Sequence, residues 1–137
     1  MNKVAVVFWS GTGNTEAMAE AIAKASNGET FTADAFSADK VDQFDAIAFG
    51  CPSMGAEQLE DGEFEPMFDS CKPSLKGKKI ALFGSYGWGD GEWMRTWEED
   101  CDAIGANRVC DSVICCEAPD ADALAACENL GKALLDA

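Results

Sequence analysis

Short, mostly apolar runs alternate along the chain with longer stretches in which apolar residues recur at helical spacing. Strands buried on both faces of a parallel sheet have such apolar runs, because neither face meets water. We therefore predict strands at Val4–Trp9, Ala46–Phe49, Ile80–Phe83 and Val109–Cys115. A weaker alternation at Phe31, Ala33 and Ala35 predicts one more strand.

The stretches between these runs are predicted to be helical. A first helix carries Met18, Ile22 and Ala25 on one face, and a last helix carries Ala123, Cys127, Leu130 and Leu134. Asp120 is the predicted N-cap of the last helix, because its carboxylate can accept from the first-turn N–H groups. Further helices are predicted at Glu63–Cys71 and Glu92–Ile104, with at most a short one at Ser37–Phe44.

Alternating strands and helices predict an α/β fold. Right-handed crossovers restrict the topology to a few orders. We expect an open five-stranded parallel sheet in the order 2-1-3-4-5, with helices on both faces and a single domain over residues 1–137.

The amino-acid composition limits which molecules the protein can bind and which catalytic mechanisms it can use. The chain has 25 acidic and 10 basic residues, a net charge of −15 and no histidine. Its surface would repel nucleic acid and anionic membranes, so we expect neither as a partner and expect basic protein faces instead. Without histidine, Ser-His-Asp and Cys-His catalysis and histidine-ligated metals are excluded.

The lengths of the apolar runs indicate where the protein is located, and the spacing of the cysteines indicates whether they bind a metal. No run has the length of a membrane span, and the first is too short for a signal peptide, so we expect a cytoplasmic protein. None of the seven cysteines forms a C-x-x-C pair. We interpret them as reduced thiols, mostly packed in the core, and expect no metal site.

Three glycine-containing loops follow predicted strands. They are SGTGNT (Ser10–Thr15), CPSMGAE (Cys51–Glu57) and GSYGWGDGEW (Gly84–Trp93). In an open parallel sheet, ligands bind beyond the carboxyl ends of the strands, where the strand order reverses. We therefore expect the three loops to meet around one ligand.

The first loop is predicted to hold an anion. It precedes a helix, so its N–H groups and the helix dipole can face a phosphate, and Ser10, Thr12 and Thr15 add hydroxyls. It lacks the lysine of a P-loop and the third glycine of the dinucleotide fingerprint. Taken alone, such a turn could be purely structural.

The other two loops suit a flat ring. Glycines interleaved with Tyr86 and Trp88 can hold a ring by backbone groups and stack it on an indole. Met54 could place its thioether on the opposite ring face, and Glu57 could accept a ring N–H. The middle loop could also be no more than a proline turn. Trp93 and Trp97, four residues apart, are interpreted as core.

The three segments WSGTGNTEAMA, GCPSMG-x-E-x-L-E and LFGSYGWGDGEWM, in this order, resemble the short-chain flavodoxins of anaerobic bacteria. The resemblance covers nearly the whole chain. It implies the flavodoxin-like fold and a monomeric, low-potential electron carrier. Its non-covalently bound FMN would shuttle between semiquinone and hydroquinone. The implied partners are redox proteins with basic faces, such as a reductase, a hydrogenase or a pyruvate-oxidising enzyme, and no catalytic residue or metal is implied.

The resemblance also assigns residues to parts of FMN. The 5′-phosphate would be bound by Ser10, Gly11, Thr12, Gly13, Asn14 and Thr15, with Ser53 and Ser85 beside the ribityl–phosphate end. Met54 would cover the inner ring face and Trp88 the outer face, with Tyr86 in the same loop. The N5 and N3 edge would meet Gly55, Ala56 and Glu57, and the N1/O2 edge would meet Gly87 and Gly89. Ala56 stands where some relatives have an acidic or polar residue.

Two other functions remain to be weighed against an electron carrier. A flavodoxin-like NAD(P)H-dependent FMN or quinone reductase would need an additional pocket, for which these minimal loops offer little material. A phosphoacceptor receiver domain would need aspartates after the central strands, where this chain has Trp9-Ser10 and Gly50-Cys51.

Overall fold

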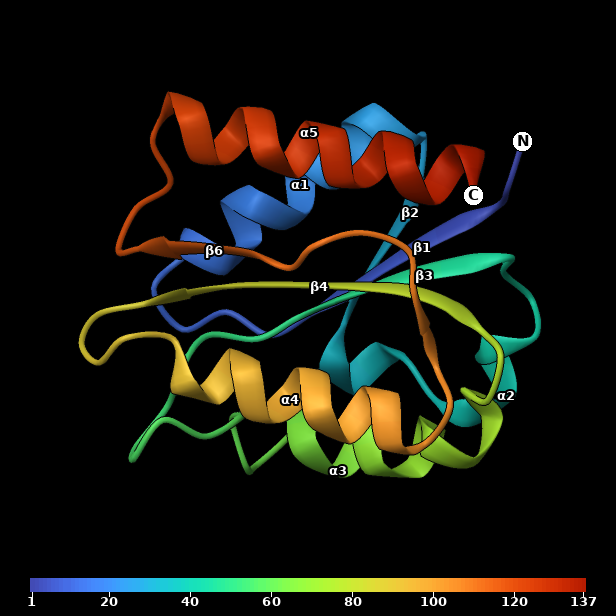
Figure 1. The fold of residues 1–137 in the computed structure, drawn as a ribbon, viewed down its shortest axis with the longest axis horizontal. Coiled ribbons are helices and arrows are strands. Elements are labelled where there is room, and N and C mark those ends of the chain that lie inside the picture. Colours follow the sequence, from blue (N-terminus) through green and yellow to red (C-terminus); the bar gives the residue numbers. More distant parts are fainter.

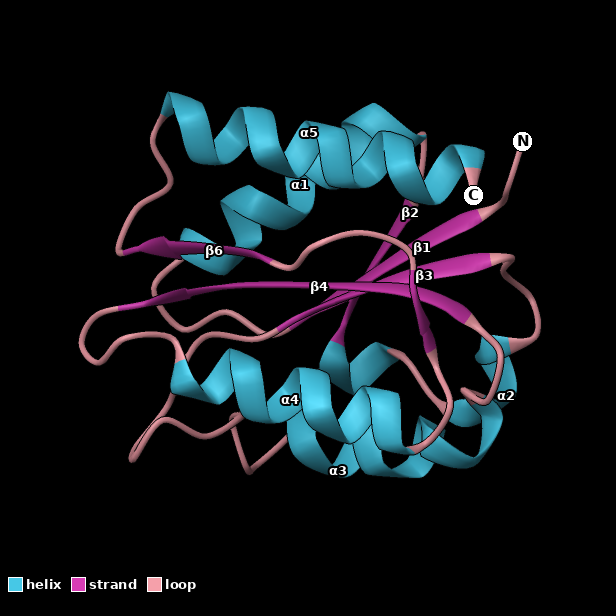
Figure 2. Ribbon diagram, in the orientation of Figure 1, coloured by secondary structure: helices cyan, strands magenta, loops and turns pink.

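The computed structural model describes residues 1–137 and consists of a central sheet between two layers of helices (Figures 1 and 2). The strands are β1 (Val4–Phe8), β2 (Glu29–Thr32), β3 (Ala46–Gly50), β4 (Lys79–Tyr86), β5 (Asn107–Arg108) and β6 (Val113–Cys116). The α-helices are α1 (Asn14–Ser26), α2 (Ala38–Val41), α3 (Phe64–Cys71), α4 (Glu92–Ala103) and α5 (Ala121–Asp136). Two short 3₁₀ turns occupy Ala33–Ala35 and Lys72–Ser74.

The sheet has the predicted topology. Its order is β2-β1-β3-β4-β5, every pair of neighbours is parallel, and β6 also pairs with β4. The predicted N-cap is confirmed as well, since the Ala123 N–H donates to the Asp120 carboxylate at 2.8 Å.

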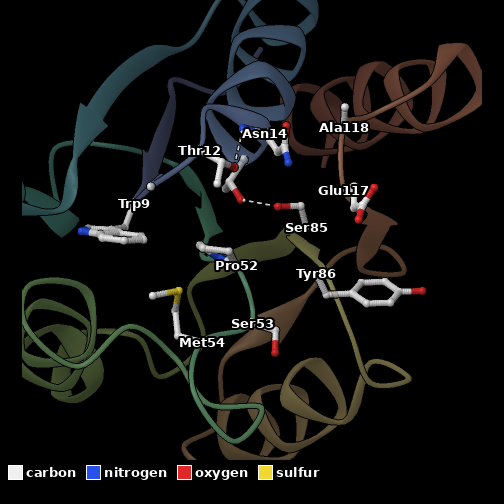
Figure 3. Close-up of a pocket in the computed structure, with 13 residues that line it drawn as sticks. Trp9, Thr12, Asn14, Pro52, Ser53, Met54, Ser85, Tyr86, Glu117 and Ala118 are labelled. Atoms are coloured by element: carbon white, nitrogen blue, oxygen red, sulfur yellow. Dashed lines mark hydrogen bonds between the residues drawn. The ribbon is translucent and has the colours of Figure 1, made fainter.

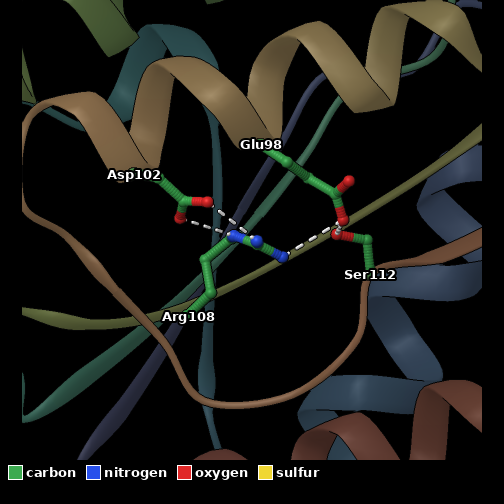
Figure 4. Close-up of polar contacts among 4 residues, drawn as sticks. All are labelled: Glu98, Asp102, Arg108 and Ser112. Atoms are coloured by element: carbon green, nitrogen blue, oxygen red, sulfur yellow. Dashed lines mark hydrogen bonds and ion pairs between the residues drawn. The ribbon is translucent and has the colours of Figure 1, made fainter.

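The predicted fifth strand, Val109–Cys115, is a strand only in its last part, because β5 ends at Arg108 and β6 begins at Val113. Arg108 at the end of β5 makes two hydrogen bonds of 2.9 and 3.0 Å to Asp102 on α4 and one of 3.2 Å to Glu98 (Figure 4). The Ser112 hydroxyl donates to the same Glu98 carboxylate at 2.6 Å. Arg108 and Ser112 are thus tied to α4 at the two ends of the break, whereas Val109 and Cys110 between them pack against the core beneath α1 and α5.

Other boundaries also differ from the predicted ones. The alternation Phe31, Ala33, Ala35 does not continue as a strand, because β2 ends at Thr32 and the chain turns into a 3₁₀ helix. Trp9 lies outside β1, and β4 extends to Tyr86.

The two faces of the sheet have separate cores. Ala5 and Val7 of β1 face the cluster beneath α3 and α4, whereas Val4, Val6 and Phe8 face the cluster beneath α1 and α5. This alternation explains why the strands are apolar throughout. In Figure 1, α1 and α5 lie above the sheet and α3 and α4 below it.

The cysteines are free, as predicted, and mostly lie inside. Cys51, Cys71, Cys101 and Cys127 are buried, Cys110 and Cys115 are half-buried, and Cys116 is exposed. No group of side chains has the arrangement of a metal site. The helices are too short or too polar to span a membrane.

We predict that Gly131→Ala destabilises the fold, although alanine favours a helix over glycine by about 1 kcal/mol. A Cβ at Gly131 would lie 2.6 Å from the Ile22 carbonyl oxygen of α1, so the two helices would have to separate. Overpacking of this kind costs roughly 1–3 kcal/mol. Denaturant unfolding should show a net loss of up to about 2 kcal/mol, whereas the exposed neighbour Asn129→Ala should be neutral or stabilising. An increase in stability for Gly131→Ala would contradict the close approach.

Candidate functional site

Three neighbouring parallel strands have their carboxyl ends at one edge of the sheet, although β4 extends three residues further than β1 and β3. Phe8 of β1 pairs with Gly50 of β3, and Gly50 pairs with Phe83 of β4. The loops that follow these strands lie together at the left of Figure 1, with the loop after β6 beside them, and both termini lie at the opposite edge.

A cavity of about 750 Å³ lies among these loops (Figure 3). Thirteen residues line it: Trp9, Gly11, Thr12, Asn14, Thr15, Pro52, Ser53, Met54, Ser85, Tyr86, Gly87, Glu117 and Ala118. Trp9 and Met54 lie on one side of it, and Tyr86 and Glu117 on the other. The volume is in the usual range of about 300–1,000 Å³ for cofactor sites.

The first loop presents a helix N-terminus to the cavity. Gly13, with φ 93°, precedes α1 and leaves the helix without a side-chain N-cap. The Ser10 hydroxyl accepts from the Gly13 and Glu16 N–H groups at 3.0 and 3.3 Å, which fixes the curvature of the loop. The Thr15 and Ser85 hydroxyls are 3.1 Å apart on the cavity wall. Backbone N–H groups, hydroxyls and the helix dipole together make an anion site.

The sequence-predicted residues divide into two groups. The cavity is lined by Gly11, Thr12, Asn14, Thr15, Ser53, Met54, Ser85, Tyr86 and Gly87. The cavity wall does not include Ser10, Gly13, Gly55, Ala56, Glu57, Trp88 and Gly89. Of these, Trp88 projects at the surface and is 63% exposed.

The middle loop is held in shape by its own backbone and by Glu57. Met54 and Gln58 form an antiparallel bridge with two hydrogen bonds of 2.8 Å. Gly55 and Glu57 both have φ 54°. The Glu57 carboxylate accepts from the Glu92 N–H of α4 at 3.1 Å, and thus lies at the N-terminus of that helix. It joins the second loop to the third.

Sequence reasoning missed four of the lining residues. Trp9 was assigned to the end of the first strand, and Pro52 was treated as part of a turn. Glu117 and Ala118 follow β6, whose carboxyl end lies at the same edge as those of β1, β3 and β4. The rule that pointed to the other three loops applies equally to this one, and the signal was therefore available.

Glu60 stabilises the segment between the middle loop and α3. Burial would raise the pKa of Glu60, but the Phe64, Glu63 and Gly62 N–H groups donate to its carboxylate and lower the pKa below its usual value. Glu60 thus caps α3.

Burial raises the pKa of the Cys51 thiol to about 12, so this cysteine is a poor nucleophile at neutral pH.

The cavity suits a ligand with an anionic end and a flat, partly apolar end. The anion site lies at α1, while Met54, 38% exposed, and Trp9 offer apolar surface nearby. The Ser53 hydroxyl is buried without a hydrogen-bond partner in the protein and can donate to a polar ligand atom. These donors and surfaces fit the phosphate, ribityl chain and ring of FMN.

Comparisons with known proteins agree with this chemistry. The family model for flavodoxins matches residues 6–131. The chain is similar to a flavodoxin of Megasphaera elsdenii, with 47% identity over 95% of this chain and 96% of the relative. It is also similar to a flavodoxin of Clostridium beijerinckii, with 43% identity over 93% and 95% of the two chains. The solution structure of two-electron reduced M. elsdenii flavodoxin superimposes with a TM-score of 0.89 at 45% identity, covering 98% and 99% of the chains.

We predict that Trp93→Phe destabilises the fold more than Trp97→Phe does. Both indoles are buried on α4, at 2% and 1% exposure. Trp93 Nε1 donates to the Cys51 carbonyl at 3.1 Å, whereas Trp97 Nε1 has no partner. The two changes remove the same volume, but only the first leaves a buried carbonyl without its donor, at about 1–3 kcal/mol. Chemical denaturation should show this difference, and equal losses for the two variants would contradict it.

Proposed function

The chain belongs to the flavodoxin family, and we propose that it carries single electrons at low potential with FMN bound in the cavity described above. Flavodoxins are electron-transfer proteins that bind FMN. The protein is therefore an FMN-binding electron carrier and not an enzyme that converts a substrate. When bound, FMN supplies a ring that accepts and returns electrons one at a time.

One observation carries the placement of FMN in this cavity. The N-terminus of α1 and the hydroxyls of Thr12, Thr15 and Ser85 offer an anion site at one end, and exposed Met54 offers an apolar surface within the same cavity. We assign the phosphate to Ser10–Thr15, with Ser53 and Ser85 beside it. The ring is assigned to Met54–Glu57 and Tyr86–Gly89.

The anion site works without a positive side chain, and this affects the potential. A lysine at the phosphate would place a positive charge close to the ring, where it would favour the addition of electrons. Instead, exposed acids such as Asp61 and Glu92 lie in the segments that follow the second loop and end the third. Their repulsion opposes a negative charge on the ring and keeps the potential low.

The same acids support a proposal about partners. A net charge of −15 favours docking on basic faces of redox proteins, with association that is fast and sensitive to salt. A reductase, a hydrogenase or a pyruvate-oxidising enzyme would offer such a face. The charge also opposes self-association, so we propose a monomer, and the seven free thiols fit the reducing cytoplasm.

Stepwise reduction of the purified protein tests the function. We expect one FMN per chain and two resolved one-electron steps in the visible spectrum, because a carrier of single electrons must separate them. NADH alone should not bleach the flavin. Direct bleaching by NADH would instead support the reductase function, and a single two-electron step would contradict one-electron transfer.

We predict that the double variant Asp61→Asn/Glu92→Gln raises the second midpoint potential more than the first. Each carboxylate at about 10 Å contributes roughly 20 mV in a water-like dielectric. The second electron adds the negative charge that these acids oppose. Spectroelectrochemical titration at low salt measures both potentials. The control Glu29→Gln/Asp136→Asn removes the same charge beside the amino ends of the strands and should shift neither by more than a few mV. Equal shifts of the two potentials would contradict the assignment.

A further inference from the structure

Trp9 and Glu63 join the first loop to the segment that continues the second loop toward α3, across 54 positions of sequence. Trp9 directly follows β1, and Glu63 directly precedes α3. The Trp9 Nε1–H donates to Glu63 Oε1 at 3.1 Å. The contact connects the loop that offers the anion site to the segment that leads into α3.

The indole ring of Trp9 is fixed on a second side by Gly11. A Cβ added to Gly11 would lie only 3.1 and 3.2 Å from two carbons of this ring, so the ring lies directly along the backbone of the anion loop. The same ring lines the cavity beside Pro52 and Met54 (Figure 3). Its orientation therefore sets the shape of one cavity wall.

Glu63 is itself held in place by the cap of α3. Its N–H donates to Glu60 Oε1 at 2.8 Å, which fixes the backbone from which the Glu63 side chain extends. Residues 57–71 contain no lysine or arginine, so no cation competes with the indole N–H for this carboxylate from its own loop. A chain of contacts thus runs from Glu60 through Glu63 to Trp9.

We propose that Glu63 is a positioning residue that acts through Trp9 and thereby sets how tightly the cavity holds FMN. This inference rests on the proposed function. An indole held by Gly11 and Glu63 presents a preformed wall, whereas an untethered indole must be ordered when the cofactor binds. The tether therefore strengthens binding although Glu63 carries a negative charge.

The negative charge of Glu63 and its hydrogen bond to Trp9 affect FMN affinity in opposite directions, so a variant can distinguish the two effects. FMN carries an anionic phosphate, so removing a nearby acid should tighten binding if only charge matters. Loss of the tether should weaken it. Asp61, two residues from Glu63, is exposed and has no side-chain partner, and it provides a control of equal charge.

The experiment is a double-mutant cycle on the FMN dissociation constant, measured by flavin fluorescence with protein stripped of FMN. Trp9→Phe and Glu63→Ala should each weaken binding about fivefold, which is about 1 kcal/mol. The double variant should be no weaker than the worse single variant, because both remove one contact. Glu63→Gln keeps an acceptor oxygen and Asp61→Ala leaves the tether intact, and since each removes one negative charge, both should bind FMN equally well or more tightly than the unaltered chain.

A second measurement needs no cofactor. The Trp9 indole N–H resonance, assigned by its loss in Trp9→Phe, should shift and exchange faster in Glu63→Ala but not in Asp61→Ala. Multiplicative losses in the cycle, a Glu63→Ala variant that binds FMN normally, or an unshifted resonance would overturn the inference. If the unaltered chain failed to bind FMN while the resonance shifted as expected, the proposed function would fail and the Trp9–Glu63 contact would stand.

Discussion

The site depends on one constraint of the sheet, namely that β1, β3 and β4 are parallel neighbours whose carboxyl ends lie at the same edge. Phe8 and Gly50, the last residues of β1 and β3, are in register with each other and with Phe83, and β4 continues for three more residues to Tyr86. The order reverses here: β1 crosses to β2 on one side through α1, while β3 crosses to β4 on the other through α3. The two connections separate and leave space above the strand ends. A binding site at this point follows from topology before any side chain is considered.

The loops around that space are not independent of one another. Each pair of the three is joined by a contact that involves a side chain: Trp9 with Glu63, Glu57 with the Glu92 backbone, and Thr15 with Ser85. Glycine-rich loops lose much conformational entropy on ordering, and contacts made before a ligand arrives reduce what binding must supply. The acidic residues therefore have two roles. Glu57, Glu60 and Glu63 accept hydrogen bonds that hold the loops in shape. Asp61 has no side-chain hydrogen-bond partner and contributes mainly to the negative electrostatic field.

The sequence predicted the layers and the sheet order because these depend on local periodicity, which a parallel sheet buried on both faces makes unambiguous. It failed where a distant side chain decides the local structure. The break between β5 and β6 depends on Arg108 and Ser112 reaching Glu98 of α4, a contact that apolar spacing cannot reveal. Trp9 was taken as strand because its type is apolar. Its partner Glu63 looked like one more solvated acid.

The lack of a cation in SGTGNT has a physical reason in this structure. The N-cap residue of α1 is Gly13, which has no side chain to offer, and of the first-turn N–H groups those of Asn14 and Glu16 donate to Thr12 and Ser10. The helix dipole and the Thr15 N–H remain available to an anion. Partial charges of this kind act over the first turn and fade beyond it, whereas a lysine charge would extend across the whole cavity. A short-range anchor can hold a phosphate without offsetting the negative field of the surrounding carboxylates. The fold thereby separates the binding of an anionic cofactor from the control of its potential, two demands that a single basic side chain would bring into conflict.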